Sequence, residues 1–487
     1  MKRIICLIIA FVLVVIGVSA CSRNDQPTGQ STEQLSEQTC ASTTTDDSQP
    51  VDTTPVADIP VIKYDGRSFD VYGETDMLQT FFFAEEPGTD NVQGAKYRMI
   101  TNIEERYGID ITIMDARIVG IPYVTTFEGM VDGGDCPYHL VEMHDVLGTG
   151  AALSGYCTNL KDVKYLEFDK PWWHNINELA VNDSVYMIAT DMSFLDIAQT
   201  WCLYFNKTLM SDMNIEYPYQ SVLDGTWTID ELIRLTKDVY ADKNKNNVVD
   251  QGDIYGISVG YSMYGWMDSF GIPMVQKDDS GRLVVTDRVD EVAAAIDKVV
   301  TWLTSNVGAT TSGLENTYDR SGFEDGQYLF FQNNMRYAAD ALRNLQNFDY
   351  GILPMPKYSE TKEYISTTMS YPFWIPANYS SEELEYIGLI VEALSYEGYQ
   401  LLTPAYFDVA LKNKFVPSEI DAQVITIIND CRHPDISRYY DNGGSGMYNI
   451  LYELHKKGSA DVMSYFDSKK GPTQELLDWY NTAYGLD

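Results

Sequence analysis

The chain has 487 residues, of which 45% are hydrophobic and 13% aromatic, a composition typical of globular rather than disordered proteins. Its net charge of −37 argues against nucleic acid or an anionic lipid surface as a partner. The 7 cysteines include no C-x-x-C pair, which argues against a disulfide scaffold and gives little support for a zinc or redox centre.

The first residues have the pattern of a secretory signal. A basic start is followed by an apolar run from Ile4 to Val18, shorter than the ~20 residues that a membrane-spanning helix needs. The small residues Val18-Ser19-Ala20 then precede Cys21, which resembles a bacterial lipobox. We therefore predict a signal peptide over residues 1–20 and lipidation of Cys21. The alternative is an ordinary cleaved signal with an incidental cysteine.

The next segment, Ser22 to Pro60, contains no aromatic residue and is dominated by Ser, Thr, Gln, Asp and Pro. Such a composition cannot bury enough apolar surface to fold. We predict that residues 21–60 are a lipid-anchored disordered tether, and that the body beginning at Val61 is large enough for two lobes.

Residues 96–143 predict a helix followed by two strands. The helix is expected to end near Tyr107, because Gly108 suits a C-cap, and a strand from Ile109 to Met114 follows. Residues 138–143, YHLVEM, read as the next strand. Residues 148–155 nearly imitate a dinucleotide loop, but Leu153 stands where the third glycine belongs, so we expect a turn or helix start.

Helices and strands continue to alternate along the rest of the chain. Thr228 and Glu231 form a potential capping box for an amphipathic helix that reaches Tyr240, and a strand is expected from Ile254. Residues 289–306 predict another amphipathic helix, and the capping pattern recurs with a serine at 380 and a glutamate at 383. This alternation predicts an α/β fold.

Between the capped helix and the strand lies DKNKNNVVDQGD, residues 242–253, with the spacing of an EF-hand calcium loop. A strand, not a helix, is expected to follow, so we predict a single structural Ca²⁺ site and not a sensor pair. Asn247 replaces the usual glycine, and Asp253 replaces the usual glutamate and weakens the site. The alternative is a solvated polar turn. The predicted ligands are Asp242, Asn244, Asn246, the Val248 carbonyl, Asp250 and Asp253.

Aromatic residues gather in loop-like stretches. A sugar ring lays its apolar face on an aromatic ring while its hydroxyls need polar partners, so such clusters suit carbohydrate recognition. For any single ring, packing in the core or a hinge is a slightly better explanation than ligand contact. The candidate ligand-binding residues are Trp266, Trp173, Trp374, Tyr264, Tyr371, Trp172 and Trp201.

Signatures of catalysis are absent from the sequence. It contains no HExxH, GxSxG or Walker motif, and none of its 5 histidines stands in a spacing that identifies a base or metal ligand. A glycosidase needs a pair of carboxylates, but 71 acidic residues give no basis for choosing one pair.

Several segments together resemble the extracellular solute-binding lipoproteins of ABC importers, of the family 1 or sugar-binding type. The resemblance runs from about Ser68 to the C-terminus through IEERYGIDI, DKPWWHNINELAVNDSVYMIATD, YFNKTLM, GTWTIDELIRLTKDVY, GILPMPKY and YPFWIPAN. It implies two α/β lobes with a ligand cleft between them and a hinge motion that closes it. We assign residues 61–190 plus 330–376 to lobe 1 and residues 191–329 plus 377–487 to lobe 2.

The resemblance implies a monomeric binding protein, not an enzyme, on the outer face of a bacterial cell membrane. It would capture a carbohydrate, such as an oligosaccharide, and deliver it to a membrane permease. The alternatives are a lipid-anchored glycan-processing enzyme and a binding lipoprotein for a non-sugar solute.

Overall fold

The computed structural model describes residues 55–74, 76–174, 176–250, 252–259, 263, 265–305, 309–310, 320–342, 345–368, 371–412, 418–441, 446–459 and 461–486. All described residues belong to one compact unit. The predicted signal peptide and most of the predicted tether lie outside the described residues.

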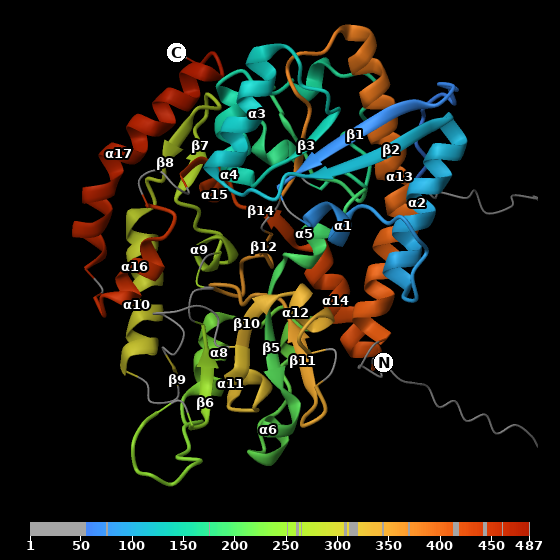
Figure 1. Ribbon diagram of the computed structural model, residues 1–487. Coiled ribbons are helices and arrows are strands. Elements are labelled where there is room, and N and C mark those ends of the chain that lie inside the picture. Colours follow the sequence, from blue (N-terminus) through green and yellow to red (C-terminus); the bar gives the residue numbers. More distant parts are fainter. Residues whose placement is uncertain are drawn as a thin grey trace, which may run out of the picture. The chain divides into compact units, whose positions relative to one another are not determined.

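Five strands form the first sheet, in the order β2-β1-β3-β13-β4. Figure 1 labels the three neighbouring strands β2, β1 and β3. β1 runs parallel to β2 and β3, and β13 is antiparallel to both β3 and β4. The carboxyl ends of β1, β2, β3 and β4 therefore lie along one edge. The strands are β1 (Arg67–Gly73), β2 (Ile109–Asp115), β3 (Leu140–Glu142), β4 (Met187–Ile188) and β13 (Phe373–Trp374).

Helix α2 (Asn91–Tyr107) confirms the first expected boundary. The Asp90 side chain caps its start by accepting a hydrogen bond from the Gln93 backbone N–H at 2.7 Å. It ends at Gly108, whose φ of 64° lies in the left-handed region that favours glycine. The chain then enters β2, so the predicted helix, glycine stop and strand are all found.

The two predicted capping residues also act at helix starts. The Thr228 hydroxyl accepts from the Glu231 backbone N–H at 3.4 Å, ahead of α8 (Ile229–Thr236). The Ser380 hydroxyl accepts from the Glu383 backbone N–H at 3.3 Å, ahead of α13 (Ser381–Lys412). α8 is shorter than expected, because the chain leaves the helix after Thr236 to enter the 242–253 loop.

A second sheet also has five strands, in the order β11-β5-β10-β6-β9. β5 is antiparallel to β10 and β11, whereas β6 is parallel to β10 and β9. The strands are β5 (Trp201–Asn206), β6 (Tyr255–Ser258), β9 (Ala309–Thr310), β10 (Tyr328–Asn334) and β11 (Tyr350–Leu353).

The two sheets are the centres of two lobes, and they divide the chain differently from the boundaries assigned by sequence. Most of β10 and all of β11 fall in residues 330–376, assigned to lobe 1, yet they pair with strands of the second sheet. α13 falls in residues 377–487, assigned to lobe 2, yet it packs against α2. All 7 residues of β10 are buried, so this strand needs a partner on each side, but its sequence does not specify which.

Two short sheets complete the β-structure. β12 (Ser366–Thr368) pairs in parallel with β14 (Arg432–Pro434), and β7 (Val275–Lys277) pairs with β8 (Leu283–Val285) in antiparallel fashion. An isolated bridge joins Thr200 to Thr368.

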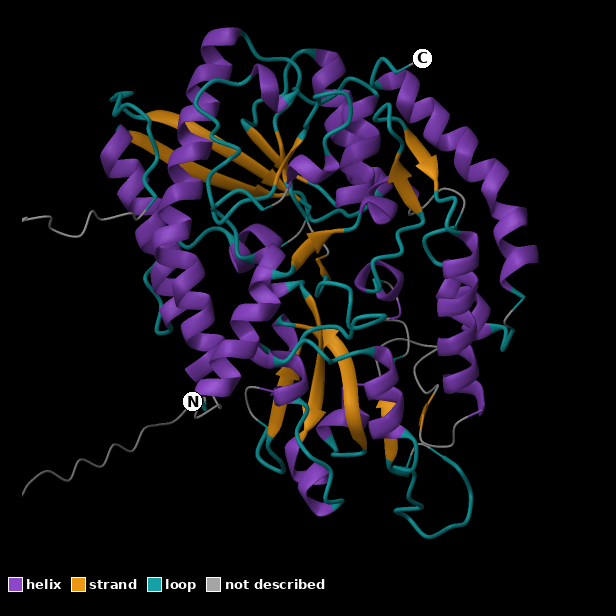
Figure 2. Ribbon diagram, turned by 180° about the vertical axis from the view of Figure 1, so that it is seen from behind, coloured by secondary structure: helices purple, strands orange, loops and turns teal. Residues whose placement is uncertain are grey.

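Helices surround both large sheets (Figure 2). Beyond those already named, they are α1 (Met77–Phe81), α3 (Ile121–Gly133), α4 (Asp145–Leu153), α5 (Leu195–Ala198), α6 (Lys207–Asp212), α7 (Tyr219–Leu223), α9 (Trp266–Ser269), α10 (Val289–Ser305), α11 (Arg320–Glu324), α12 (Arg336–Ala339), α14 (Glu419–Asp430), α15 (Ile436–Asp441), α16 (Ile450–Lys456) and α17 (Val462–Ala483), with 3-10 helices η1 (Leu160–Asp162) and η2 (Ile176–Leu179). None of the helices in the described part of the chain has both the length and the apolar character needed to cross a bilayer.

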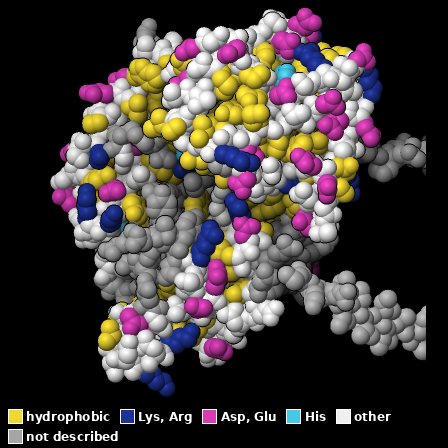
Figure 3. Space-filling view, in the orientation of Figure 1, with side chains coloured by type: hydrophobic (Ala, Val, Ile, Leu, Met, Phe, Trp, Pro, Cys, Tyr) yellow, Lys and Arg dark blue, Asp and Glu magenta, His cyan; other side chains and the backbone are white. Residues whose placement is uncertain are grey.

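Two clusters of buried apolar side chains form the core. One joins the first sheet with α2 and α13, and the other is built mainly on the second sheet with α8, α10 and the C-terminal helices. Outside the core, basic side chains lie near acidic ones at several places on the face shown in Figure 3, and they do not merge into one basic patch.

Candidate functional site

The chain passes between the sheets through segments that lie side by side. One segment leaves β4 of the first sheet and reaches β5 of the second sheet through α5. Another contains β12 and lies between β11 of the second sheet and β13 of the first. The bridge from Thr200 to Thr368 joins these two, and β14 pairs with β12 as a third segment. We call residues 189–200, 366–368 and 431–435 the crossing segments.

A cavity of about 340 Å³ lies beside the crossing segments. This volume is within the range of roughly 300–1,000 Å³ that is usual for small-molecule sites. Aromatic and proline side chains supply its apolar wall, namely Pro171, Trp173, Tyr399 and Pro434. Charged and polar side chains supply the remainder, among them His174, Asp191, Asp196, Thr403, Asn429, Asp430 and Arg432.

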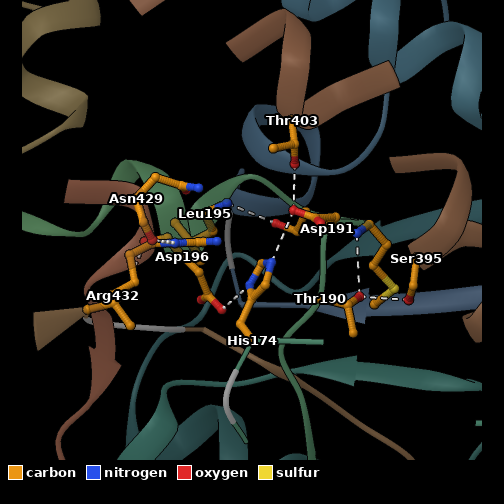
Figure 4. Close-up of polar contacts among 12 residues, drawn as sticks. His174, Thr190, Asp191, Leu195, Asp196, Ser395, Thr403, Asn429 and Arg432 are labelled. Atoms are coloured by element: carbon orange, nitrogen blue, oxygen red, sulfur yellow. Dashed lines mark hydrogen bonds and ion pairs between the residues drawn. The ribbon is translucent and has the colours of Figure 1, made fainter. Parts of the chain in front are cut away.

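His174 is held between two acidic side chains of this cavity (Figure 4). Its Nε2 lies 3.0 Å from Asp191 Oδ1, and its Nδ1 lies 3.1 Å from Asp196 Oδ2. Thr403 on α13 donates its hydroxyl to the same Asp191 oxygen at 2.5 Å. With a carboxylate at each ring nitrogen, the arrangement favours an imidazolium that donates on both sides.

The electrostatics agree with this protonation state. Burial and the nearby Arg432 lower the pKa of His174, but Asp191 and Asp196 outweigh both, so its pKa is raised. Burial lowers the pKa of Arg432, against the opposing effect of the same two carboxylates. The cavity wall is therefore a network of fixed charges that can offer both donors and acceptors to a polar ligand.

A second charged cluster lies next to the cavity, around His433 of β14. The His433 Nδ1 lies 3.2 Å from Asp268 of α9, and its Nε2 lies 2.7 Å from Glu178 of η2. Burial lowers the pKa of His433, but Asp268 and Glu178 outweigh it and raise the pKa to about 11. The protonated ring thereby links η2, which precedes β4 of the first sheet, to a helix that follows β6 of the second.

The predicted pair Trp172 and Trp173 is held by one acidic side chain. The Trp173 Nε1 donates to Glu392 Oε2 at 3.0 Å, and the Trp172 Nε1 donates to Glu392 Oε1 at 2.6 Å. Trp172 is fully buried, whereas Trp173 lines the cavity with only 5% of its surface exposed. Glu392 on α13 thus fixes both indoles, and Trp173 is the predicted aromatic residue that reaches this site.

The other predicted aromatics occupy different places. Trp266, Trp374 and Trp201 are core side chains with at most 2% of their surface exposed. Tyr371 is half-buried and packs edge-on against His144, with ring centroids 5.2 Å apart. Tyr264 lies outside the described residues. Ligand contact by any of these rings stays a prediction.

Acidic side chains also line the edge formed by the carboxyl ends of the first sheet. Glu142 ends β3, Glu74 directly follows β1, and Asp115 ends β2; Glu142 and Glu74 are buried. Burial, Glu74 and Asp115 raise the pKa of Glu142 well above its ordinary value, so the protonated acid is favoured.

An ion pair follows directly after this edge. Arg438 of α15 donates its Nε to Asp145 Oδ2 at 2.8 Å, at the start of α4, and both side chains are buried. Burial raises the pKa of Asp145, but Arg438 and His144 outweigh it and lower the pKa, so the acid stays ionised.

The loop predicted to hold calcium is described at all six of its predicted ligand residues. Asn244 and Asn246 donate their side-chain amides to Asp250, at 2.9 and 2.6 Å. Among the described residues, no group of three or more His, Cys, Asp or Glu side chains is placed to hold a metal ion. Calcium binding therefore stays a prediction. Cys21 lies outside the described residues, so its lipidation also stays a prediction.

Sequence reasoning missed most of the cavity. His174, Thr403 and Arg432 come from three stretches of the chain, and Asp191 and Asp196 share a fourth, so no short motif connects the set. The available signal was weak: His174 immediately follows the Trp pair, and Asp191 lies in the segment that leaves the first sheet.

Comparison with known proteins gives a family and a fold. Residues 99–392, more than half of the chain, match the model of a family described as bacterial extracellular solute-binding protein. No curated protein matches the chain.

Similar solved structures include UspC of M. tuberculosis, at 13% identity and a TM-score of 0.55, covering 84% of this chain and 100% of that chain. RafE of Streptococcus pneumoniae, in its apo form, has 14% identity and a TM-score of 0.53, covering 85% and 99%. The ABC substrate-binding protein Lmo0181 of Listeria monocytogenes, in complex with cycloalternan, has 14% identity and a TM-score of 0.51, covering 87% and 100%. At these identities the likeness shows the two-lobed fold that the sequence predicted.

Proposed function

This chain belongs to the bacterial extracellular solute-binding proteins, and from that premise we propose that its ligand is a carbohydrate, which it delivers to the permease of an ABC importer. The observation that carries the proposal is the cavity of about 340 Å³ beside the crossing segments. Its wall combines fixed charged groups with aromatic rings. A sugar needs both, because its hydroxyls are donors and acceptors and its ring faces are apolar.

The chemistry of the wall supports a neutral polyhydroxyl ligand. The two negative charges of Asp191 and Asp196 are offset by the His174 imidazolium between them and by Arg432, so these groups do not need a charged ligand for balance. Asp430 is an exposed acceptor on the rim, and Tyr399 is a half-buried ring on the opposite helix, α13. Lmo0181, which has the same fold, is described in complex with cycloalternan.

The place of the cavity supports capture by lobe closure. Its wall includes residues of the crossing segments, of α13 beside the first sheet and of α14, which packs against β11 of the second sheet. A rotation of one lobe about the crossing segments changes the distance between these walls, which is how hinged binding proteins enclose a ligand. The protein acts as a monomer and breaks no bond of the ligand.

Attachment to the membrane is the second part of this proposal. Acylation of Cys21 and a tether over residues 21–60 hold the lobes near a permease on the outer face of the cell membrane. The test is the intact mass of the mature protein, which should begin at a lipid-modified Cys21. A mature protein with an unmodified N-terminus beyond Cys21 contradicts this part alone.

The site is tested by calorimetric titration of two cavity variants, Tyr399→Ala and Asp430→Asn, with a glycan that raises the melting temperature of the wild type. Tyr399→Ala removes a ring face, and Asp430→Asn removes the negative charge and replaces one acceptor oxygen with an amide donor. We expect dissociation constants at least about tenfold higher, since a hydrogen bond to a charged group contributes about 1.5–3 kcal/mol.

Trp479→Ala is the matched control, because this ring is 50% exposed on α17 and does not line the cavity. Its affinity should equal that of the wild type. Unchanged affinity in both cavity variants, with unchanged melting temperatures, places the sugar elsewhere.

A further inference from the structure

We propose that the loop of residues 242–253 binds one Ca²⁺, and that Asp253 is the buried ligand which couples the ion to the second sheet. The proposal concerns a site separate from the cavity and does not depend on the nature of the transported solute. It rests on the side chains that face the loop interior and on one buried oxygen that has no hydrogen-bond partner.

The first ligand position faces the loop interior. Asp242 accepts hydrogen bonds from the backbone N–H groups of Asn246, at 3.2 Å, and Asn247, at 2.8 Å. Asn247 has a φ of 61° and Lys245 a φ of 60°, so the chain turns back on itself around this carboxylate. Asn247 thus adopts the left-handed conformation for which such loops usually have a glycine.

Three further ligand positions converge on one another. The amides of Asn244 and Asn246 both contact the Asp250 carboxylate, at 2.9 and 2.6 Å. The amide oxygens of Asn244 and Asn246 accept the backbone N–H groups of Asn246 and Val248, at 3.0 and 2.7 Å, so each amide would have to turn its oxygen towards Asp250 to contact a cation. Two Asn oxygens and the Asp250 carboxylate would then face a common centre, and a cation there would remove the repulsion between them.

Asp253 provides the observation that is independent of the loop pattern. Its side chain is fully buried. Oδ2 accepts from the Tyr240 hydroxyl at 2.8 Å and from the Asp250 backbone N–H at 3.2 Å, on the loop side. Oδ1 is buried and has no hydrogen-bond partner. A buried carboxylate oxygen without a partner is costly, and a bound cation would satisfy it.

The ligand chemistry selects calcium among common metal ions. Every predicted ligand atom is an oxygen, from carboxylates, amides and the Val248 carbonyl, which suits a hard cation and not zinc or copper. The three carboxylates alone do not form a metal cluster, so the amide and carbonyl oxygens must complete the set. Ca²⁺ accepts such a large and irregular set, whereas Mg²⁺ requires near-octahedral geometry and retains its water.

The loop is joined directly to the second sheet. Ala241 and Ile254 bridge its base through two backbone hydrogen bonds of 3.1 and 2.9 Å. The Tyr255 hydroxyl donates to the Asp250 carbonyl at 2.7 Å, and Tyr255 is the first residue of β6, which pairs with β10. An ion held by Asp250 and Asp253 therefore stabilises the start of β6 and, through it, the second lobe.

The experiment uses the complete mature chain after metal removal with a chelator, titrated by calorimetry with CaCl₂ and separately with MgCl₂. We expect one Ca²⁺ per chain with a dissociation constant of ~10⁻⁴–10⁻³ M, as in extracellular sites of this kind, and much weaker binding of Mg²⁺. Asp242→Asn and Asp253→Asn should each weaken Ca²⁺ binding at least about tenfold, because each removes one of three carboxylate charges.

Asp212→Asn is the control, since this exposed acid on α6 lies outside the loop. It should bind Ca²⁺ as the wild type does. Melting temperatures measured with and without Ca²⁺ show whether each variant is folded. Absence of binding at ~10 mM Ca²⁺ overturns the proposal, and so does binding by both loop variants that is as tight as in the wild type.

Discussion

His433 lies between Glu178 and Asp268, which raise its pKa from the ordinary 6.5 to about 11 against the effect of burial. A histidine with a raised pKa in the folded state contributes its full stability below pH 6.5 and loses that contribution as the pH rises towards 11. We therefore expect the free energy of unfolding to fall between about pH 7.5 and about pH 9.5, and to fall less steeply in His433→Gln. Denaturant unfolding at several pH values measures both slopes.

His455 supplies the control for this titration. It is buried, and burial lowers its pKa to about 4, so it stays neutral throughout the same pH range. His455→Gln changes the stability equally at each pH and leaves the slope as in the wild type. A His433→Gln slope identical to the wild-type slope would refute the charged state assigned to His433.

The buried ion pair between Arg438 and Asp145 leads to a second prediction for single residues. Arg438→Met leaves the Asp145 carboxylate buried without its cation, and we expect the free energy of unfolding to fall by about 3–5 kcal/mol. Adding Asp145→Leu should restore much of the loss. Urea unfolding of the single and double variants measures both effects.

A surface ion pair provides the comparison. Lys298 contacts Asp230 at 2.9 Å, but the Asp230 side chain is 66% exposed, so Lys298→Met should cost only about 0–1 kcal/mol. If Arg438→Met and Lys298→Met lowered the free energy of unfolding equally, burial of the pair Arg438 and Asp145 would have no effect on its contribution to stability.

Single residues were also where sequence reasoning was least complete. A tryptophan among glycines or prolines looks the same whether it faces a ligand or fills the core, and the structure buries Trp266 and Trp374 completely. Trp173 was predicted as a site residue and does line the cavity. His174, Asp191 and Arg432 were not predicted, because only the tertiary fold brings them together.

Helix α4 contains two glycines in contrasting surroundings, which allows a matched pair of variants. A Cβ atom at Gly148 would overlap the ring of Trp374, whereas a Cβ atom at Gly150 meets no atom within 4 Å. Gly148→Ala should therefore lower the free energy of unfolding by about 1–3 kcal/mol. Gly150→Ala should raise it by about 0.5–1 kcal/mol, because alanine favours the helix. Denaturant unfolding that gives both variants the same sign would contradict the packing of α4 on β13.

Elements with local signals were predictable. Asp90 and Gly108 delimit α2, Thr228 and Ser380 begin α8 and α13, and each of these signals involves neighbours within a few residues. Strand partners were not predictable in this way. β10 and β11 belong to the second sheet because they pair with β5, which is more than a hundred residues away in the sequence. The sequence of an apolar strand does not specify which strand it pairs with.

For the molecule as a whole, the order of motifs was more informative than any single one. The resemblance across the chain predicted two α/β lobes and the solute-binding family, and both are confirmed. The division into lobes was less accurate, because the chain crosses between the sheets and then returns through α13 to pack on α2. Each crossing depends on contacts between residues far apart in the sequence. The lobe boundaries therefore follow from which strands pair within each sheet.

Carbohydrate capture is best tested by a thermal-shift screen of the mature protein against a panel of glycans, amino acids and short peptides, with the recovered ligand analysed for cleavage. A ligand bound only by the folded state adds about 2.7 kcal/mol of stability at a hundredfold excess over its dissociation constant. We predict that at least one glycan raises the melting temperature and is recovered intact, while the amino acids and peptides have no effect. A rise produced only by amino acids or peptides, or the accumulation of glycan fragments, would contradict the proposal that this protein captures a carbohydrate for transport.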